Sequence, residues 1–320
     1  MSQLKTVSII IPFYGQNESQ LAVPLSSINN QLTVDFSSFD VHLINDGGKP
    51  VDIGLLRQFF PKLDLHYHQL KKNVGAGLAR QYGIDHSESD YLMFVDADDQ
   101  LYQENSLSFF FEAVKNDGTH DLFSSYYNRE GLEPGNTGNI IYTQGIFDFS
   151  AVFARWLNRK FLENHKLQFS SELRSFEDFY LLGLITKLTN DHLRIDRITY
   201  LSHYRADSLT HAKKFVATGE FVRQWRLQLT YLRDNGYQVQ LQQQFEELLL
   251  YIYLYHAKFR PSGVDEKVFQ AEKRRLLTEF PQLRQPYSFQ LQQYVNQRSM
   301  DSKDYYYGIA TNDLKSFLET

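Results

Sequence analysis

Three aspartates, Asp96, Asp98 and Asp99, directly follow an apolar run that has the pattern of a β-strand. Closely spaced carboxylates repel one another, and a bound divalent cation that prefers oxygen ligands relieves this repulsion. An EF-hand loop beginning at Asp96 does not fit, because its sixth position is Leu101 instead of glycine and its twelfth is Leu107 instead of glutamate. The cluster therefore predicts a metal site, with a solvated acidic turn that caps the next helix as the alternative.

A second pair of carboxylates, Glu177 and Asp178, stands at the start of a predicted helix. In a pocket, the repulsion between the two would raise the pKa of one member and make it a general base. The alternative is a pair of acids that caps the helix and complements the positive end of its dipole. Sequence position alone leaves both interpretations open.

The segment 73–83 contains closely spaced glycines and a single arginine, Arg80. Gly75, Gly77 and the acidic Asp96 partly match a dinucleotide-binding fingerprint. The match fails at Arg80, where that fingerprint needs glycine or alanine for close packing of the helix on the strand. An arginine near the start of a helix is instead suited to hold a diphosphate, because the helix N-terminus and the guanidinium both attract phosphate.

The last predicted strand ends in His203, Tyr204 and Arg205, and Ser208 and Thr210 follow shortly after. An arginine at this position is suited to neutralise a phosphate. A single histidine is more often structural than a metal ligand, so these residues alone leave the role of His203 open.

Short β-branched runs alternate with helical patterns over the first two thirds of the chain, which is typical of an α/β protein with a mostly parallel sheet. Ligands of such sheets bind at the carboxyl ends of the strands, where Asp96 and Asp98 fall. Glycine, asparagine and proline are frequent over 128–145, which predicts a loop there. The predicted strands cover 7–12, 40–45, 63–69, 91–95, 121–126 and 195–204, and the predicted helices cover 19–31, 77–86, 106–117, 147–164 and 179–188.

The strand pattern ends near residue 211, and apolar residues then recur at helical spacing. We therefore predict an α/β domain over 1–212 and an all-helical domain over 213–320, whose net charges are 18 − 26 = −8 and 15 − 12 = +3. The basic run 273–275 would suit an anionic acceptor or a membrane surface, with a solvated helix face as the alternative. The tyrosines at 305–307 fit packing on the first domain, an acceptor groove or a dimer interface equally well.

Composition narrows the classes of function. The 320 residues include no cysteine, which excludes disulfides, Cys-ligated zinc, iron–sulfur clusters and thiol nucleophiles. The net charge of 33 − 38 = −5 argues against a general nucleic-acid-binding protein. The most apolar later stretch, 248–257, is half as long as a membrane span of roughly 20 residues. Because the N-terminus has no signal-peptide pattern, we expect a cytoplasmic protein.

Taken in order and spacing, these motifs resemble those of the family-2 inverting glycosyltransferases of the GT-A fold, over about residues 5–212. The departures from the family pattern are one extra residue between Tyr14 and Leu21, and Gly48, Gln81, Gln103 and Arg155 where other residues are usual. None of these departures removes a carboxylate. No Gln-x-x-Arg-Trp motif occurs, so a processive polysaccharide synthase is not expected. The matching segments are 7–14, 44–47, 73–83, 96–99, 155–162 and 177–178, with Tyr204, Arg205, Ser208 and Thr210.

The resemblance implies that a UDP-sugar binds at the carboxyl edge of the sheet and that a single in-line displacement inverts its anomeric carbon. Asp46 would accept a hydrogen bond from the imide N–H of uracil, Asp178 would be the catalytic base, and Glu177 would orient the site or bind the acceptor. The remaining implied roles fall into two groups. Mn²⁺ or Mg²⁺ would be held by Asp96, Asp98 and His203, and Asp96 would also contact the donor. The further donor-binding residues would be Pro12, Phe13, Tyr14, Glu18, Asn73, Gly75, Arg80, Ala97 and Arg205.

The implied acceptor is a hydroxyl of a glycan, a cell-surface polymer or a glycoprotein, and neither a nucleic-acid partner nor a transmembrane segment is expected. A peripheral contact at the inner membrane face and a homo-oligomer formed through the helical domain are left open. A nucleotidyltransferase is one alternative, but it would have a glycine-rich loop after the first strand, where this chain has Pro-Phe-Tyr-Gly-Gln-Asn. The other is a non-catalytic sugar-nucleotide- or glycan-binding module, which would usually have lost a carboxylate, whereas Asp96, Asp98 and Asp178 are all present.

Overall fold

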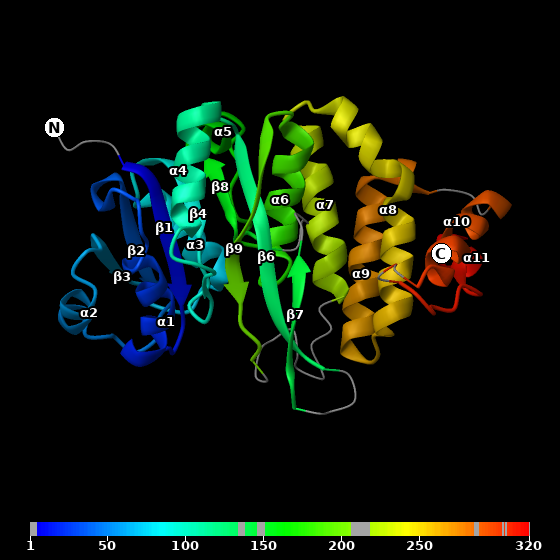
Figure 1. Ribbon diagram of the computed structural model, residues 1–320. Helices are drawn as coiled ribbons and strands as arrows, with labels where there is room; N and C mark the ends of the chain where they lie inside the picture. The colour runs from blue at the N-terminus through cyan, green and yellow to red at the C-terminus, as the bar shows by residue number, and fades with distance from the viewer. Residues whose placement is uncertain are drawn as a thin grey trace. The chain divides into compact units, whose positions relative to one another are not determined.

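The computed structural model describes residues 5–133, 138–145, 151–205, 218–284, 288–302, 304 and 306–319 (Figure 1). These residues form two compact units, which are described separately below. The first unit contains the chain up to Arg174 together with 181–205, and the second contains Ser175–Tyr180 together with 218–319. The predicted boundary between 212 and 213, as well as Ser208, Thr210 and Tyr305, lies outside the described residues.

A nine-stranded sheet forms the centre of the first unit, in the order β3-β2-β1-β4-β8-β6-β9-β5, with β7 paired to β6. The first four strands in this order are parallel to one another, as expected, and the other half of the sheet is mixed. The parallel part supplies the strand ends at which the candidate site is built. The strands are β1 (Lys5–Phe13), β2 (Phe39–Asn45), β3 (Leu65–Gln69), β4 (Ser89–Phe94), β5 (Gln100–Leu101), β6 (Leu122–Leu132), β7 (Ile140–Gly145), β8 (Arg155–Asn158) and β9 (His192–Ser202).

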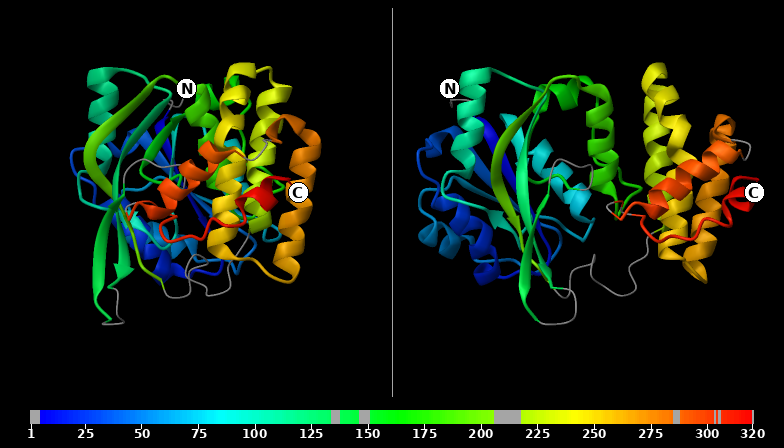
Figure 2. Two further views of the ribbon diagram at one scale, coloured as in Figure 1. Left: turned by 90° about the vertical axis from the view of Figure 1, so that its right-hand side faces the viewer. Right: turned by 45° about the vertical axis from the view of Figure 1, so that its right-hand side comes forward.

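Helices cover both faces of this sheet, as the right-hand view of Figure 2 shows. Alternate residues of β1, such as Ile9 and Ile11, point into a core that also holds Leu25 of α1 and Phe110 of α4. The opposite face is covered by α3, where Gly83 lies so close that an added Cβ would be 2.5 Å from Ile10. The helices are α1 (Glu18–Asn29), α2 (Ile53–Phe59), α3 (Ala76–Asp85), α4 (Ser106–Asp117), α5 (Arg159–Asn164) and α6 (Glu177–Leu188).

Two of the sequence predictions are wrong, and α2 and β5 were not predicted at all. The predicted loop over 128–145 contains the end of β6 and the whole of β7, which pair as an antiparallel hairpin. The side chains of β7 are mostly exposed, so no apolar alternation indicated a strand. The predicted helix over 147–164 contains β8 followed by α5, apart from 146–150, which lie outside the described residues. β8 is buried between β4 and β6 and directly follows the apolar run 151–154, and a short apolar stretch of this kind cannot be distinguished from a buried helix by periodicity.

All the regular secondary structure in the described residues of the second unit is helical, as predicted for the C-terminal region. Of the apolar residues at helical spacing in α7, Val222, Leu229 and Leu232 are fully buried and Trp225 is half-buried. The basic run 273–275 does not form one charged face, because Lys273 is buried and donates to the Phe317 carbonyl oxygen. Tyr306 is also buried. The helices of this unit are α7 (Thr218–Asp234), α8 (Gln238–Phe259), α9 (Val264–Glu279), α10 (Phe289–Met300) and α11 (Leu314–Glu319).

Candidate functional site

The candidate donor site lies where the parallel strands β1, β2 and β4 end at the same edge of the sheet. Tyr14 follows β1, Asp46 follows β2, and Asp96 comes shortly after β4. This juxtaposition arises because the apolar parts of the three strands are buried side by side in parallel register. Polar side chains that directly follow such strands therefore gather at one edge, where α/β folds bind ligands.

The carboxylate of Asp46 shapes the loop that leads into α3. It is buried and accepts two backbone hydrogen bonds, from Val74 N to Oδ1 at 2.7 Å and from Gly75 N to Oδ2 at 2.9 Å. Gly75 has φ +95° and forms the N-cap of α3, a conformation that favours glycine. Because each carboxylate oxygen has two acceptor positions, Asp46 keeps the capacity to accept a hydrogen bond from a ligand. The predicted contact with the uracil imide stays a prediction.

Four of the residues predicted to bind the donor differ in accessibility. Pro12 and Phe13 are buried within β1, whereas the Tyr14 side chain is 59% exposed and is available to a ligand. Asn73 lies on the loop before α3 and accepts a hydrogen bond from Arg174 Nη1 at 3.0 Å. Of these four residues, Tyr14 and Asn73 are therefore the ones whose polar atoms a donor can reach.

Arg80 and Asp96 form an ion pair across the start of α3 and the end of β4. Arg80 Nη2 lies 2.7 Å from Asp96 Oδ1, with the guanidinium buried and the carboxylate one-third exposed. The backbone N–H of Asp96 donates to the Tyr200 hydroxyl at 3.1 Å. Asp96 is therefore held from two sides, and its side chain remains one-third exposed. The next residue, Ala97, is buried.

Asp98 and Asp99 differ in their partners. Arg205 Nη1 donates to Asp98 Oδ2 at 3.0 Å, and both side chains are about one-third exposed. Burial and the charge of Asp96 nevertheless raise the pKa of Asp98 above its ordinary value. Asp99 is buried and accepts hydrogen bonds from the Tyr200 hydroxyl at 2.8 Å and from His203 N at 2.9 Å. Burial, with the charges of Asp96 and Asp98, raises the pKa of Asp99 to about 8.

His203 is oriented by a carboxylate that the sequence analysis did not identify. Its Nδ1 lies 3.1 Å from Glu130 Oε2 on β6, and the same oxygen accepts from Tyr204 N at 3.1 Å. A histidine whose Nδ1–H is donated to a carboxylate presents the lone pair of Nε2 outward, which is the usual arrangement of a metal-binding histidine. Glu130 is separated from His203 by 73 positions, so no local pattern in the sequence could have linked them.

The predicted metal ligands, Asp96, Asp98 and His203, are chemically suited to a divalent cation. They offer two carboxylates and one imidazole, and a cation would stabilise the charged form of Asp98, whose pKa is raised by burial and by the charge of Asp96. Within the described residues, these three do not bring one ligand atom each within 4.8 Å of the others, whereas Asp40, His42 and His66 do. Each aspartate is held by an arginine instead, and the metal assignment stays a prediction.

Glu177 and Asp178 form the first turn of α6 and belong to the second unit. The preceding residue, Phe176, has φ +61°, a left-handed conformation that is costly for an aromatic residue. Its ring packs edge-on against Phe221 and Tyr255, at centroid distances of 5.5 and 5.9 Å. Packing therefore holds Phe176 in this conformation and fixes the direction in which the acidic pair leaves the loop. Their predicted catalytic roles remain predictions.

A hollow of about 990 Å³ lies on the first unit between α1, α2 and β5. It is lined by residues that include Glu18, Phe59 and Tyr102, and by none of the carboxylates discussed above other than Glu18. The Glu18 carboxylate accepts a hydrogen bond from Asp52 N at 2.6 Å, so it connects α1 to the N-cap of α2. Glu18 therefore lines this hollow, and its predicted contact with the donor stays a prediction.

Comparisons with known proteins identify relatives for most of the chain. Residues 8–175 match the family model of Glycosyl transferase family 2. Poly(ribitol-phosphate) beta-N-acetylglucosaminyltransferase TarP of Staphylococcus aureus is 24% identical over 68% of this chain and 68% of its own length. Minor teichoic acid biosynthesis protein GgaB of Bacillus subtilis is 26% identical over 62% of this chain, and the match spans only 23% of GgaB.

A solved structure shares the fold. S. aureus TarS 1-349 in complex with UDP-GlcNAc superimposes with a TM-score of 0.65 at 17% identity, covering 92% of this chain and 85% of that one. The match confirms the expected GT-A fold with an all-helical C-terminal region. None of the helices in the described part of the chain is long and apolar enough to cross a membrane.

Proposed function

Because the chain belongs to Glycosyl transferase family 2, we propose that it transfers a sugar from a UDP-sugar to a hydroxyl group with inversion at the anomeric carbon. The observation that carries this proposal is the set of charged groups at the carboxyl edge of the sheet. The Arg80–Asp96 and Arg205–Asp98 ion pairs lie there, next to the loop shaped by Asp46. This edge has the mixture of cations and carboxylates that a nucleoside diphosphate and its metal ion need.

We propose UDP-N-acetylglucosamine as the donor and a hydroxyl of a cell-surface polymer as the acceptor. TarP is named as an N-acetylglucosaminyltransferase that acts on poly(ribitol-phosphate), and TarS was solved with UDP-GlcNAc. Both are similar to this chain over most of its length. We assign the catalytic domain to 1–212 and a separate helical domain to 213–320. A cytoplasmic location fits this assignment, because nucleotide sugars are cytoplasmic donors.

Asp46 and Arg80 would bind the nucleotide. The Asp46 carboxylate would accept a hydrogen bond from the uracil imide N–H, and the exposed ring of Tyr14 would lie beside the base. Arg80 would hold Asp96 against the donor, and Arg205 could exchange its contact with Asp98 for one with a phosphate oxygen. The residues close to the diphosphate would thus supply positive charge where the leaving group becomes more negative.

Asp96, Asp98 and His203 would hold Mn²⁺ or Mg²⁺, whose charge would stabilise the departing UDP. Glu130 would keep the His203 ring oriented, with Nε2 directed away from Glu130. Asp178 would take the proton from the acceptor hydroxyl, while Glu177 would position the acceptor. The acceptor oxygen would form its bond to the anomeric carbon as the bond to the UDP oxygen breaks, so no covalent enzyme intermediate forms.

The proposal is tested by incubating the full chain with Mn²⁺ and a panel of UDP-sugars and measuring released UDP. We expect slow, metal-dependent hydrolysis of UDP-N-acetylglucosamine, which needs no known acceptor. Asp98→Ala should abolish it, whereas Asp117→Ala, an exposed aspartate at the end of α4, should not. Release of pyrophosphate in a separate incubation with UTP and a sugar 1-phosphate would indicate a nucleotidyltransferase. If no UDP-sugar of the panel is hydrolysed and UDP with Mn²⁺ does not raise the thermal unfolding temperature, the proposal is wrong.

A further inference from the structure

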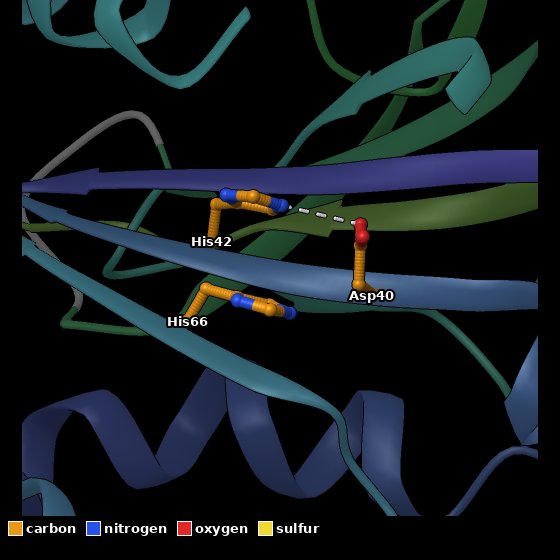
Figure 3. Close-up of side chains that lie close together, drawn as sticks. All are labelled: Asp40, His42 and His66. Carbon is orange, nitrogen blue, oxygen red and sulfur yellow. Dashed lines mark ion pairs between the residues drawn. The ribbon is translucent and has the colours of Figure 1, made fainter. Parts of the chain in front are cut away.

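A group of polar side chains lies on the face of the sheet that α3 covers, within β2 and β3. Asp40 and His42 are on the same face of β2, and His66 of β3 is the cross-strand neighbour of His42. The two imidazole rings are stacked, with centroids 4.8 Å apart. His42 Nε2 lies 3.3 Å from Asp40 Oδ1, and Figure 3 shows Asp40 beside the His42 ring with His66 next to it. None of these residues belongs to the predicted donor site.

Several buried polar atoms in this group lack a well-formed hydrogen bond. Within the described residues, Ser8 Oγ, Asp40 Oδ1 and His42 Nε2 are buried without one. Ser8 is the cross-strand neighbour of Asp40 on the other side, so the three atoms belong to one region. The side chains of Asp40 and His42 are more than nine-tenths buried. Asp40 Oδ1 and His42 Nε2 face each other at 3.3 Å without good hydrogen-bond geometry, and a set of buried polar atoms paired as poorly as this one can hold an ion or a water molecule.

We propose that Asp40, His42 and His66 form a binding site for a transition-metal cation, with Zn²⁺ as the preferred ion. Each residue can offer one ligand atom, and the three atoms lie within 4.8 Å of one another. Two imidazole nitrogens and one carboxylate oxygen are a common protein ligand set for Zn²⁺, and a water molecule or the Ser8 hydroxyl could complete a tetrahedral shell. Mg²⁺ prefers oxygen ligands alone and should bind far more weakly.

The surroundings of His42 fit the role of a metal ligand. His42 Nδ1 lies 3.2 Å from His68 Nε2, so His68 can accept the Nδ1 proton. This tautomer leaves the lone pair of His42 Nε2 on the side of Asp40. His68 would thus orient its neighbour in the way that outer-shell partners of metal-binding histidines do. On the exposed side, Asp64 Oδ1 lies 3.2 Å from His66 Nε2 and adds a second carboxylate near the site.

A cation at this position would connect an edge strand to the rest of the sheet. β3 is the last strand on this side of the described sheet and pairs only with β2 there. An ion bound to His66 on β3 and to Asp40 and His42 on β2 would add a cross-strand link. Because it would bind the folded state and not the unfolded one, it should raise the thermal unfolding temperature.

The site is tested by titrating the metal-free full chain with Zn²⁺, using competition with a chromophoric chelator. We expect binding of Zn²⁺ that Mg²⁺ does not displace. His66→Ala should weaken it on the order of 100-fold or more, because even the loss of an outer-shell partner costs about 10–100-fold. His66 is nearly half exposed, so this variant should fold. The matched control is His86→Ala, which removes a nearby histidine that is not among the three ligands.

Two further measurements separate this site from the carboxyl edge of the sheet. Asp98→Asn should retain tight Zn²⁺ binding, since Asp98 is not a ligand of the proposed site. In the unmodified protein, Co²⁺ bound at the proposed site should show the visible absorption bands of a Co²⁺ ion that has nitrogen ligands. The proposal is overturned if the unmodified protein binds Zn²⁺ no more tightly than His66→Ala does, or if Asp98→Asn removes the binding while His66→Ala retains it.

Discussion

The buried guanidinium of Arg80 donates from Nη2 to the partly exposed Asp96 Oδ1 over 2.7 Å. This pair joins the first turns of α3 to the residues that follow β4, and so connects two segments that the proposed donor must contact together. Removing one partner of a charge-assisted hydrogen bond that is partly buried costs more than removing one partner of a surface ion pair, because the remaining charge is less well solvated. The geometry of Asp96 therefore depends on Arg80.

We predict that Arg80→Met lowers both donor affinity and stability. The affinity for UDP with Mn²⁺ should fall at least about tenfold, because Asp96 loses the charge that positions it. The free energy of unfolding should fall by ~1–3 kcal/mol. Calorimetric titration and urea denaturation measure the two effects, with Arg275→Met, an exposed arginine on α9, as the control. Unchanged nucleotide affinity in a folded Arg80→Met protein would contradict the role given to the pair.

We predict that Tyr200→Phe weakens the site while leaving the sheet intact. The Tyr200 hydroxyl accepts from Asp96 N and donates to Asp99 Oδ2, so its loss leaves a buried N–H and a buried carboxylate without that partner. The expected cost is ~1–3 kcal/mol of unfolding free energy. Donor hydrolysis should also slow, because Asp96 and Asp99 lose a shared anchor. The substitution Tyr91→Phe, at a buried tyrosine whose hydroxyl contacts His120, should lower stability without slowing hydrolysis.

The charged residues at the carboxyl edge could be predicted because local patterns point to them. An apolar strand directly precedes Asp96, and a glycine-containing helix start precedes Arg80, so each side chain is positioned by its own neighbours in the chain. Glu130 could not be predicted, because its relation to His203 arises only when β6 and β9 pair in parallel. The strand β8 was missed for a similar reason, since its burial depends on two strands distant in sequence.

The histidine group illustrates the same limit. The alternating pattern of Asp40 and His42, and that of His66 and His68, places each pair on one face of its strand. Which residues then become neighbours depends on the register of β2 and β3, and a shift of β3 by one residue would move His66 and His68 to the face opposite Asp40 and His42. The sequence pattern therefore predicts which residues share a face of each strand, whereas the proposed metal site also depends on how β2 and β3 are aligned.

We predict that Asp178→Asn abolishes sugar transfer and leaves donor binding within about threefold of the unmodified protein. The substitution removes the proposed proton acceptor but keeps the size of the side chain, so the ground-state complex should form normally. Asp98→Asn should give the opposite pattern, with weakened binding of UDP and Mn²⁺. Transfer to an acceptor and calorimetric titration with UDP distinguish the two variants. A large loss of UDP affinity in folded Asp178→Asn would place this residue in the donor site instead.

We predict that the stability of the helical unit rises with pH above about 8 because of Lys273. Burial lowers the pKa of Lys273 from 10.5 to about 8, although Glu266 opposes the shift. Between these two values the folded state has released a proton that the unfolded state still holds, so the unfolding free energy increases with pH. The slope for one group is at most about 1.4 kcal/mol per pH unit. Above pH 10, buried tyrosines such as Tyr253, whose pKa burial raises, reverse the sign.

Urea denaturation between pH 8 and 9.5 isolates this effect. Lys187, buried in the other unit, has a pKa lowered by burial to about 8 as well, so only the difference between the unmodified protein and Lys273→Met reports on Lys273. The slope should be smaller in this variant than in the unmodified protein, because methionine fills the same space without a titrating group. Lys267→Met, at an exposed position of the same helix, should keep it. An equal slope in both variants would mean that Lys273 is not the source, and its buried contact with the Phe317 carbonyl would then hold no titrating charge.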